Sequence, residues 1–222
     1  MMGAWQIAWF TVACAAGATI LMLPAGVLIA WLLARRDFPG RSVVETLVSL
    51  PLVMPPVATG LLLLVLLSRR GALGGMLERL GIEIVFTWKA VVIAMAIMGL
   101  PLLVRTARAG FEQVNSRYER VAATLGAPPL RIFLTISLPL AWPSVLAGAV
   151  LGFARALGEF GATIIVAGSI PGETRTLAVA IYSFAETGRD AEAMALVAIS
   201  AAIAFCALWL STRIAAAGAR RA

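Results

Sequence analysis

Long runs without an ionisable side chain constrain this chain more than any other feature of its sequence. The runs that lack Asp, Glu, Lys and Arg are residues 1–34, 46–68, 132–154 and 193–212. Each reaches the roughly 18–20 residues with which a helix crosses the hydrocarbon layer of a bilayer. A fifth run, 90–104, becomes long enough if it begins near Ile84 and the amine of Lys89 extends to the interface.

The composition indicates the same class of protein. Of the 222 residues, 61% are hydrophobic and 13% are charged, whereas a soluble domain averages about half apolar and about a quarter charged residues. Histidine is absent and the two cysteines, Cys14 and Cys206, lie inside predicted spans, which excludes histidine metal sites and a disulfide framework. We predict an all-α, polytopic membrane protein of about five transmembrane helices, with residues 1–222 forming a single domain and no metal site.

The basic residues predict the orientation of the chain. With five spans and the N-terminus outside, the cytoplasmic segments carry eleven basic and four acidic residues, and the external segments carry six of each. This asymmetry follows the positive-inside rule and places the C-terminus in the cytoplasm. Although the sequence pI is about 10.9, the basic residues are divided among loops between spans, so we expect no nucleic-acid partner. The basic cytoplasmic residues are Arg35, Arg36, Arg41, Arg105, Arg108, Arg117, Arg120, Arg131, Arg213, Arg220 and Arg221.

The longest predicted cytoplasmic loop covers residues 105–145 and contains short helices of its own. The stretch "SRYERVAATLG" begins with Ser116, a suitable N-cap, and has Glu119 at the third helical position. Gly126 is expected to end this helix, and the two prolines that follow prevent its continuation. The result is a compact projection that fits either a protein partner or a position on the lipid surface.

A second short helix is predicted over "PLRIFLTI", after which Pro139 and Pro143 turn the chain into the membrane. Residues 132–168 are too long for one straight crossing at about 1.5 Å per residue. We therefore expect an interfacial segment over 132–138 and a tilted or broken span over 139–168.

Within this loop, "AATLGAPPLRIFLTISLPLA" resembles the cytoplasmic signature loop of ABC-importer permease subunits. That pattern reads Glu-Ala-Ala, three residues, Gly, nine residues, Ile, one residue and Leu-Pro. Arg120 and Val121 depart from it, and Glu119 lies one residue early. The resemblance implies a coupling loop over about 105–138, whose helices seat in a cleft of each ATPase. The coupling-loop residues that it implies are Glu119, Arg120, Val121, Ala122, Ala123, Gly126, Ile136, Leu138 and Pro139.

Residues 50–74, 86–112 and 153–184 extend the resemblance, because they look like the permease of molybdate ABC transporters. This likeness implies a homodimer in the inner membrane, two cytoplasmic ATPase subunits, and a periplasmic or surface-anchored binding protein that delivers molybdate. Tungstate and sulfate or thiosulfate are similar in charge and shape, so permeases for these oxyanions are alternatives. A secondary anion carrier is the alternative from a different class, although such carriers commonly contain inverted repeats and none is evident in this sequence.

The sequence contains no ATP-binding motif. No G-x-x-x-x-G-K-[ST] occurs, and the glycine-rich stretch "GALGGMLERLG" lacks the lysine. We therefore expect a transport subunit rather than an enzyme, with no cofactor on this chain. ATP and Mg are expected to bind to the partner ATPase.

Two prolines interrupt the span at 46–68. Pro55 and Pro56 remove helical hydrogen bonds, which a membrane helix tolerates where protein or a water-filled cavity satisfies the freed groups. Thr59 offers a hydroxyl near this point, and Gly60 permits close approach of another element. The pattern is typical of either a packing kink or a broken helix that lines a translocation pathway.

The segment "FARALGEFGAT" carries the only charges that are predicted within the bilayer core. Arg155 and Glu159 are one helical turn apart, so they can neutralise each other on one face. Gly158 and Gly161 allow the helix to bend beside the pathway, which Thr163 also adjoins. The charges form either a self-satisfying ion pair or a gate, in which Glu159 repels anions and Arg155 holds the helix in register.

Two further features leave their partners open. Gly148 and Gly152 form a G-x-x-x-G, the spacing at which two helices meet closely, either within one subunit or between two copies. Residues 169–192 have an apolar centre between polar ends. This pattern predicts a short helix over the outer mouth, in reach of the delivery protein, or a simple amphipathic connector.

Overall fold

The computed structural model describes residues 3–219, with side chains described as far as Arg213. Two of the predicted cytoplasmic charges, Arg220 and Arg221, lie outside the described residues. Within the described range the chain is helical and contains no strand. The helices are α1 (Ala4–Arg35), α2 (Arg41–Val53), α3 (Pro56–Leu67), α4 (Gly74–Glu78), α5 (Trp88–Gln113), α6 (Ser116–Thr124), α7 (Pro129–Ile132), the π-helical turn η1 (Phe133–Ser137), α8 (Leu138–Leu157), α9 (Gly161–Val166), α10 (Leu177–Glu186) and α11 (Asp190–Ala219).

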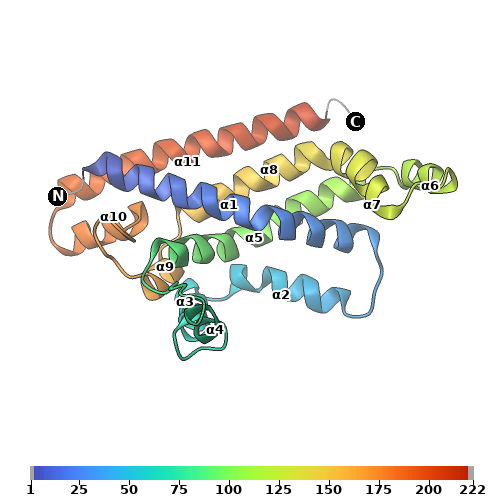
Figure 1. Ribbon diagram of the computed structural model, residues 1–222. Helices are drawn as coiled ribbons and strands as arrows, with labels where there is room; N and C mark the ends of the chain where they lie inside the picture. The colour runs from blue at the N-terminus through green and yellow to red at the C-terminus, as the bar shows by residue number, and fades with distance from the viewer. Residues whose placement is uncertain (1–2, 220–222) are drawn as a thin grey trace.

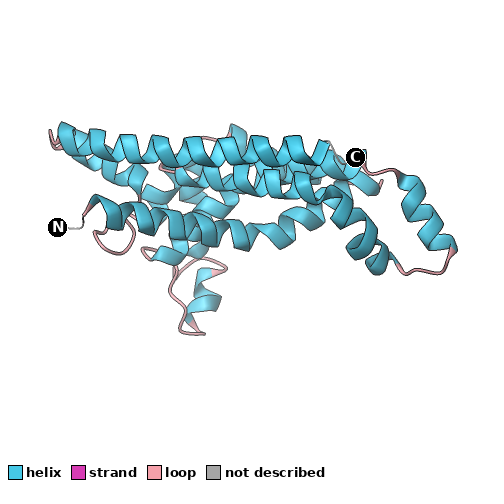
Figure 2. Cartoon of the chain, turned by 90° about the horizontal axis from the view of Figure 1, so that it is seen from above, coloured by secondary structure: helices cyan, strands magenta, loops and turns pink. Residues whose placement is uncertain are grey.

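Four long apolar helices form a bundle, and a fifth segment is bent. The continuous candidate spans among the described residues are Ala4–Arg35, Trp88–Gln113, Pro129–Leu157 and Asp190–Arg213. Helices α1, α5, α8 and α11 run along the same long direction of the molecule (Figure 1), and the view from above shows the same elongated bundle (Figure 2). Helices α2 and α3 are long and apolar enough to cross a membrane only when they are taken together, and the second helix is bent by 113° relative to the first. The expected five spans are therefore four continuous helices and one broken pair.

Helix α5 begins later than Ile84, which corrects the predicted start of this span. Phe86 has a φ of 59°, which ends any helix there, and the Thr87 side chain caps the new helix by accepting the Lys89 amide at 3.2 Å. The Lys89 amine extends outward and donates to the Glu83 carbonyl at 3.3 Å. The span gains its length at the other end instead, where α5 continues through Gln113.

The segment before Pro139 is not a separate interfacial helix, which corrects a second expectation. Helix α7 continues through η1 into α8 without a break, and Pro129–Leu157 forms one candidate span. In the π-helical turn the amide of Leu138 donates to the Phe133 carbonyl, one residue further back than in an α-helix. This wider turn ends at Ser137, two residues before Pro139, and the helix continues through the proline without a break. The expected break lies later, after Leu157.

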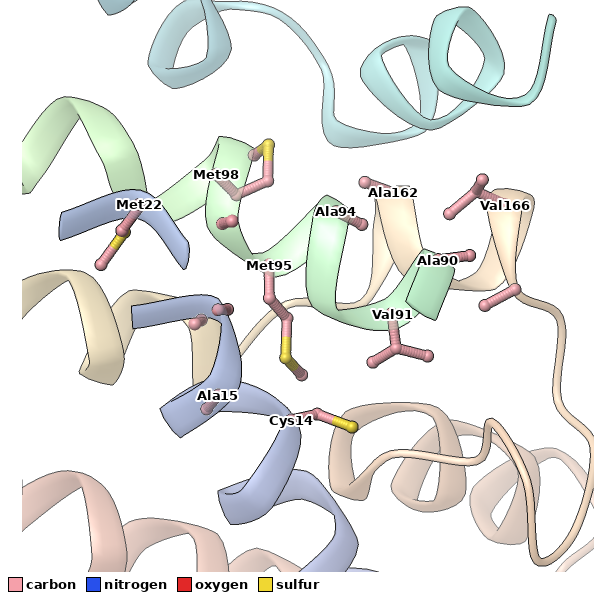
Figure 3. Close-up of a cluster of buried hydrophobic side chains, with 14 of the residues drawn as sticks. Cys14, Ala15, Met22, Ala90, Val91, Ala94, Met95, Met98, Ala162 and Val166 are labelled. Carbon is pink, nitrogen blue, oxygen red and sulfur yellow. The ribbon is translucent and has the colours of Figure 1, made fainter. Parts of the chain in front are cut away.

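Small residues bring α1, α5 and α8 into close contact. The core joins Cys14, Ala15 and Met22 of α1 to Met95 and its neighbours on α5 (Figure 3). A Cβ on Gly152 would meet the Met22 side chain at 2.4 Å, and the partner of the G-x-x-x-G is therefore within this chain. A Cβ on Gly148 would approach a backbone carbonyl of α5 at 3.0 Å.

Candidate functional site

Two interrupted helices meet at one place in the molecule. The first interruption separates α2 from α3 at Met54 and Pro55, and the second separates α8 from α9 at residues 158–160. Helices α3 and α9 pack against each other, and both lie at the same end of the bundle in Figure 1. The structure thus unites the proline-interrupted span with the glycine-rich charged segment, which lie far apart in the sequence.

Glycines make the contact between α3 and α9 possible. A Cβ on Gly60 would lie 2.8 Å from both the Cα and the carbonyl oxygen of Ala162, and a Cβ on Gly161 would lie 2.7 Å from the Pro56 side chain. Such distances are too short for any side chain at these positions. The interruption at Pro55 is also a true break rather than a packing kink, since the two helices differ in direction by 113°.

The ion pair predicted from the four-residue spacing is present. An oxygen of Glu159 lies 2.9 Å from the Arg155 guanidinium, and Glu159 is only 1% exposed. Its other oxygen accepts the backbone amide of Ala162 at 2.8 Å, at the start of α9. Glu159 therefore joins the end of α8 to the beginning of α9, in addition to neutralising Arg155. Gly158 caps α8 with a φ of −88°, which any residue can adopt.

Two buried hydroxyls on α3 and α9 have no hydrogen-bond partner in the part of the chain that the structure describes. Thr59 on α3 is 7% exposed and Thr163 on α9 is fully buried, and neither hydroxyl oxygen has a partner among the described residues. A buried polar group without a partner costs about 1–3 kcal/mol. The two threonines are therefore the polar groups of the junction that retain unused hydrogen-bonding capacity.

Helix α10 lies over the break between α8 and α9. The Tyr182 ring packs on the Phe160 ring with centroids 4.9 Å apart, and the Leu177 amide donates to the Thr11 hydroxyl of α1 at 2.8 Å. The Tyr182 hydroxyl donates to Glu186, and this hydrogen bond raises the pKa of the exposed phenol. A short helix within 169–192 was expected, and it covers this end of the bundle.

The signature segment forms a projection at the opposite end of the molecule, beyond the ends of α1 and α5 (Figure 1). Helix α6 has Asn115, rather than the expected Ser116, as its N-cap, because the Asn115 side chain accepts the Arg117 amide at 2.9 Å. Gly126 ends the helix with a φ of 83°, as predicted. Since α5 continues through Gln113 and α7 begins at Pro129, the projection is shorter than the predicted loop.

The coupling-loop residues divide between an outer and an inner face. Glu119 faces inward, where it pairs with Arg35 of α1 and accepts the Ser137 hydroxyl at 2.6 Å. Ala122, Ile136 and Leu138 are half-buried. The exposed residues of the projection include Arg120, Val121, Ala123, Leu125 and Gly126, and Leu130 of α7 and Pro139 of α8 are exposed as well. The projection therefore presents apolar side chains outward, and its acidic residue is directed into the protein.

Residues 22–217 match the family described as "Binding-protein-dependent transport system inner membrane component". This chain belongs to that family. It is therefore a multi-pass transport component of the inner membrane rather than an enzyme. The four long apolar helices and the broken pair agree with this membership.

Several relatives carry names that specify a cargo. The chain is 44% identical, over 98% of its length and 96% of the relative, to the "Molybdenum transport system permease protein ModB" of Escherichia coli (strain K12). It is 39% identical, over 90% of its length and 88% of the relative, to the "Putative molybdenum transport system permease protein YvgM" of Bacillus subtilis (strain 168). The "Sulfate transport system permease protein CysT" of Escherichia coli (strain K12) is 39% identical over 71% of this chain and 57% of the relative.

Solved structures of other ABC transporters share the fold. A bacterial ABC transporter that imports the acidic polysaccharide alginate has a TM-score of 0.65 at 16% identity, over 97% of this chain and 80% of the other. An amino acid ABC transporter with histidines has a TM-score of 0.64 at 18% identity, and the match covers 99% of this chain and 94% of the other. At these identities the likeness concerns the fold alone.

The sequence did not predict which residues of the bundle contact Glu119 of the signature loop. Arg35 was interpreted only as part of the positive charge on the cytoplasmic side, and Ser137 was not singled out. The pairing of Arg35 with Glu119 bridges the end of α1 and the beginning of α6. No periodic pattern links residues so distant in sequence, although the displaced position of Glu119 in the signature was a signal that its contacts differ.

Proposed function

We propose that this chain is the transmembrane permease subunit of an ATP-driven importer of molybdate. The observation that carries the proposal is the 44% identity, over nearly the whole chain, to a permease named for molybdenum transport. The sulfate permease CysT matches a smaller share of this chain, at 39% identity. Molybdate is therefore the first choice of substrate, and tungstate and sulfate are the competing oxyanions.

The proposed assembly contains two copies of this chain, two cytoplasmic ATPase subunits and an external molybdate-binding protein. The basic residues support an orientation with the N-terminus outside and the C-terminus in the cytoplasm, because they concentrate at the end of the bundle that carries α6. ATP and Mg belong to the ATPase subunits, and no cofactor is assigned to this chain. The apolar exposed residues Val121, Leu125 and Leu130 are the surface that an ATPase would contact.

The junction of the two broken helices is proposed as the gate of the pathway. A divalent oxyanion needs hydrogen-bond donors, and the unpartnered hydroxyls of Thr59 and Thr163 can supply them once the junction opens. Glu159 would repel an anion while the junction is closed, and Arg155 compensates the charge of that carboxylate. The residues assigned to the gate are Pro55, Pro56, Thr59, Gly60, Arg155, Gly158, Glu159, Gly161 and Thr163.

Uptake by the reconstituted complex tests the function. Vesicles containing this permease and its ATPase are supplied with the binding protein outside and ATP inside, and molybdate, tungstate and sulfate are offered separately. We expect molybdate uptake that stops when ATP or the binding protein is omitted. Equal uptake without ATP would indicate a secondary carrier, and uptake restricted to sulfate would assign the chain to that oxyanion.

A further inference from the structure

A polar cluster of three side chains lies where the projection meets the transmembrane bundle. Arg35, the last residue of α1, donates from Nη2 to the Val114 carbonyl at 2.5 Å. Its Nε lies 3.2 Å from a carboxylate oxygen of Glu119, and the Ser137 hydroxyl donates to the same oxygen at 2.6 Å. The side chains of Arg35 and Glu119 are 14% and 18% exposed, and Ser137 is 1% exposed. The cluster is thus largely removed from solvent.

Each member of this cluster belongs to a different structural element. Val114 is the C-cap of α5, where a cation is favourable because carbonyl groups remain free at a helix C-terminus. Glu119 lies in the first turn of α6. Ser137 ends the π-helical turn that leads into α8. Arg35 and Glu119 together therefore connect α1, α5, α6 and α8 at one point.

Helix α6 depends on this cluster because it lacks an apolar anchor. None of its residues is buried, and its large apolar and aromatic side chains, Tyr118 and Val121, are exposed. A helix in proteins is normally held by burial of an apolar face. Here the charged contact of Glu119, which is partly shielded from solvent, replaces such a face. Loss of that contact would leave α6 attached mainly through the chain at its two ends.

We propose that Arg35 and Ser137 are positioning residues that act through Glu119 to couple α6 rigidly to the transmembrane helices. A displacement of α6 by an ATPase subunit is then passed to α1 and α8, instead of being absorbed at the turns on either side of α6. This inference rests on the proposed function, because it assumes an ATPase that moves α6. It also assigns Glu119 to an internal contact, so that this carboxylate is not offered to the ATPase.

The transport test compares neighbouring arginines in the complete complex. Arg36 follows Arg35 but is exposed, and its guanidinium lies over the Trp31 ring at 6.0 Å. We expect R35Q and E119Q each to lower the molybdate taken up per ATP hydrolysed by about fivefold or more, the scale of a typical coupling energy. R36Q should leave this ratio unchanged, and R35K should recover much of it. The ATPase should still copurify with every variant.

A second measurement does not depend on the cargo. Hydrogen exchange of the amides in 116–124, followed in the same purified complex, should become about tenfold faster in R35Q and E119Q, because the ion pair that holds α6 to α1 is lost. R36Q should exchange like the wild type. Unchanged exchange in R35Q and E119Q would overturn the inference, as would a wild-type uptake ratio or loss of the ATPase from these variants. A wild-type complex without molybdate uptake would instead refute the proposed function, while the exchange result would still decide the role of the cluster.

Discussion

Glu159 combines a charge with nearly complete burial, a combination that membrane proteins retain mainly at functional positions. Its two oxygens serve different partners, the Arg155 guanidinium and the Ala162 amide. The first contact lies within one helical turn and the second spans the break between α8 and α9. A change of charge at this residue therefore affects both the electrostatics of the junction and the geometry of the break.

Replacing Glu159 by Gln tests whether the charge closes a gate. The side-chain amide of Gln keeps the shape and can still accept the Ala162 amide, but it loses the negative charge and the ion pair with Arg155. We expect molybdate leak through vesicles without ATP to rise by about tenfold, since about 1.4 kcal/mol is tenfold in an equilibrium. The amount of inserted protein should remain near that of the wild type.

Glu112 supplies the matched control for this experiment. It also pairs with an arginine four residues away, Arg108, but its side chain is 46% exposed at the end of α5. An exposed pair contributes about 0–1 kcal/mol, so E112Q should leave the leak unchanged. Loss of membrane insertion in E159Q, in proportion to any change in transport, would assign Glu159 a structural role only.

At the residue scale, spacing predicts contacts within a helix and misses contacts between helices. The four-residue spacing of Arg155 and Glu159 was sufficient to predict their ion pair. The hydrogen bond that Glu159 accepts from the Ala162 backbone amide was not predicted, because it requires α8 to end at Leu157. Arg35 and Glu119 meet only because the chain folds back at the end of the bundle that carries α6, which no local pattern encodes.

At the scale of elements, the contact between α3 and α9 depends on the absence of side chains. In G60A the new Cβ would lie 2.8 Å from the Ala162 backbone, which cannot move without displacing α9. We expect a loss of about 1–3 kcal/mol of stability, measured as a lower thermal midpoint in detergent, together with slower transport. Gly17 on α1 is the control, because its Cβ would meet only Val92 at 3.7 Å, and G17A should be neutral or slightly stabilising. Equal midpoints for the two variants would contradict the close packing.

The turn after α6 yields a second prediction at this scale. Gly126 has a φ of 83° and open space around its Cβ, so G126W strains the backbone and adds bulk to the surface proposed for the ATPase. We expect a protein that inserts normally but hydrolyses ATP without matching uptake. Gly81 has a φ of 72° and equally open surroundings at the other end of the bundle. G81W should therefore remain coupled, and normal ATP-driven transport by G126W would refute the assignment of the coupling loop.

The positions of the helices along the chain were largely predictable from the sequence, whereas the angles between them were not. Hydropathy located the long spans, and the prolines at 55 and 56 located the break, because both signals are local. The prolines do not by themselves define the bend of 113° or the packing of α3 on α9, which are tertiary properties. A separate short helix was predicted before Pro139, and that prediction was wrong because α7, the π-helical turn and α8 follow one another without a break.

At the scale of the whole molecule, charge distinguishes the two ends of the bundle. In a variant without Cys14 and Cys206, a cysteine in place of Leu125 should react with an impermeant thiol reagent only from the cytoplasmic side. A cysteine in place of Leu80 should react only from outside. Both leucines are exposed, at 82% and 66%, so access to the reagent is not limited by burial. The reverse labelling pattern would contradict the proposed orientation.

In the proposed transporter, ATP hydrolysed by a partner subunit drives molybdate through this chain. The most direct measurement is the initial rate of molybdate uptake into vesicles that contain the complete complex, with ATP or with a non-hydrolysable analogue inside. We expect rapid uptake with ATP, and only the background rate of protein-free vesicles with the analogue. Equal uptake under the two conditions would contradict it.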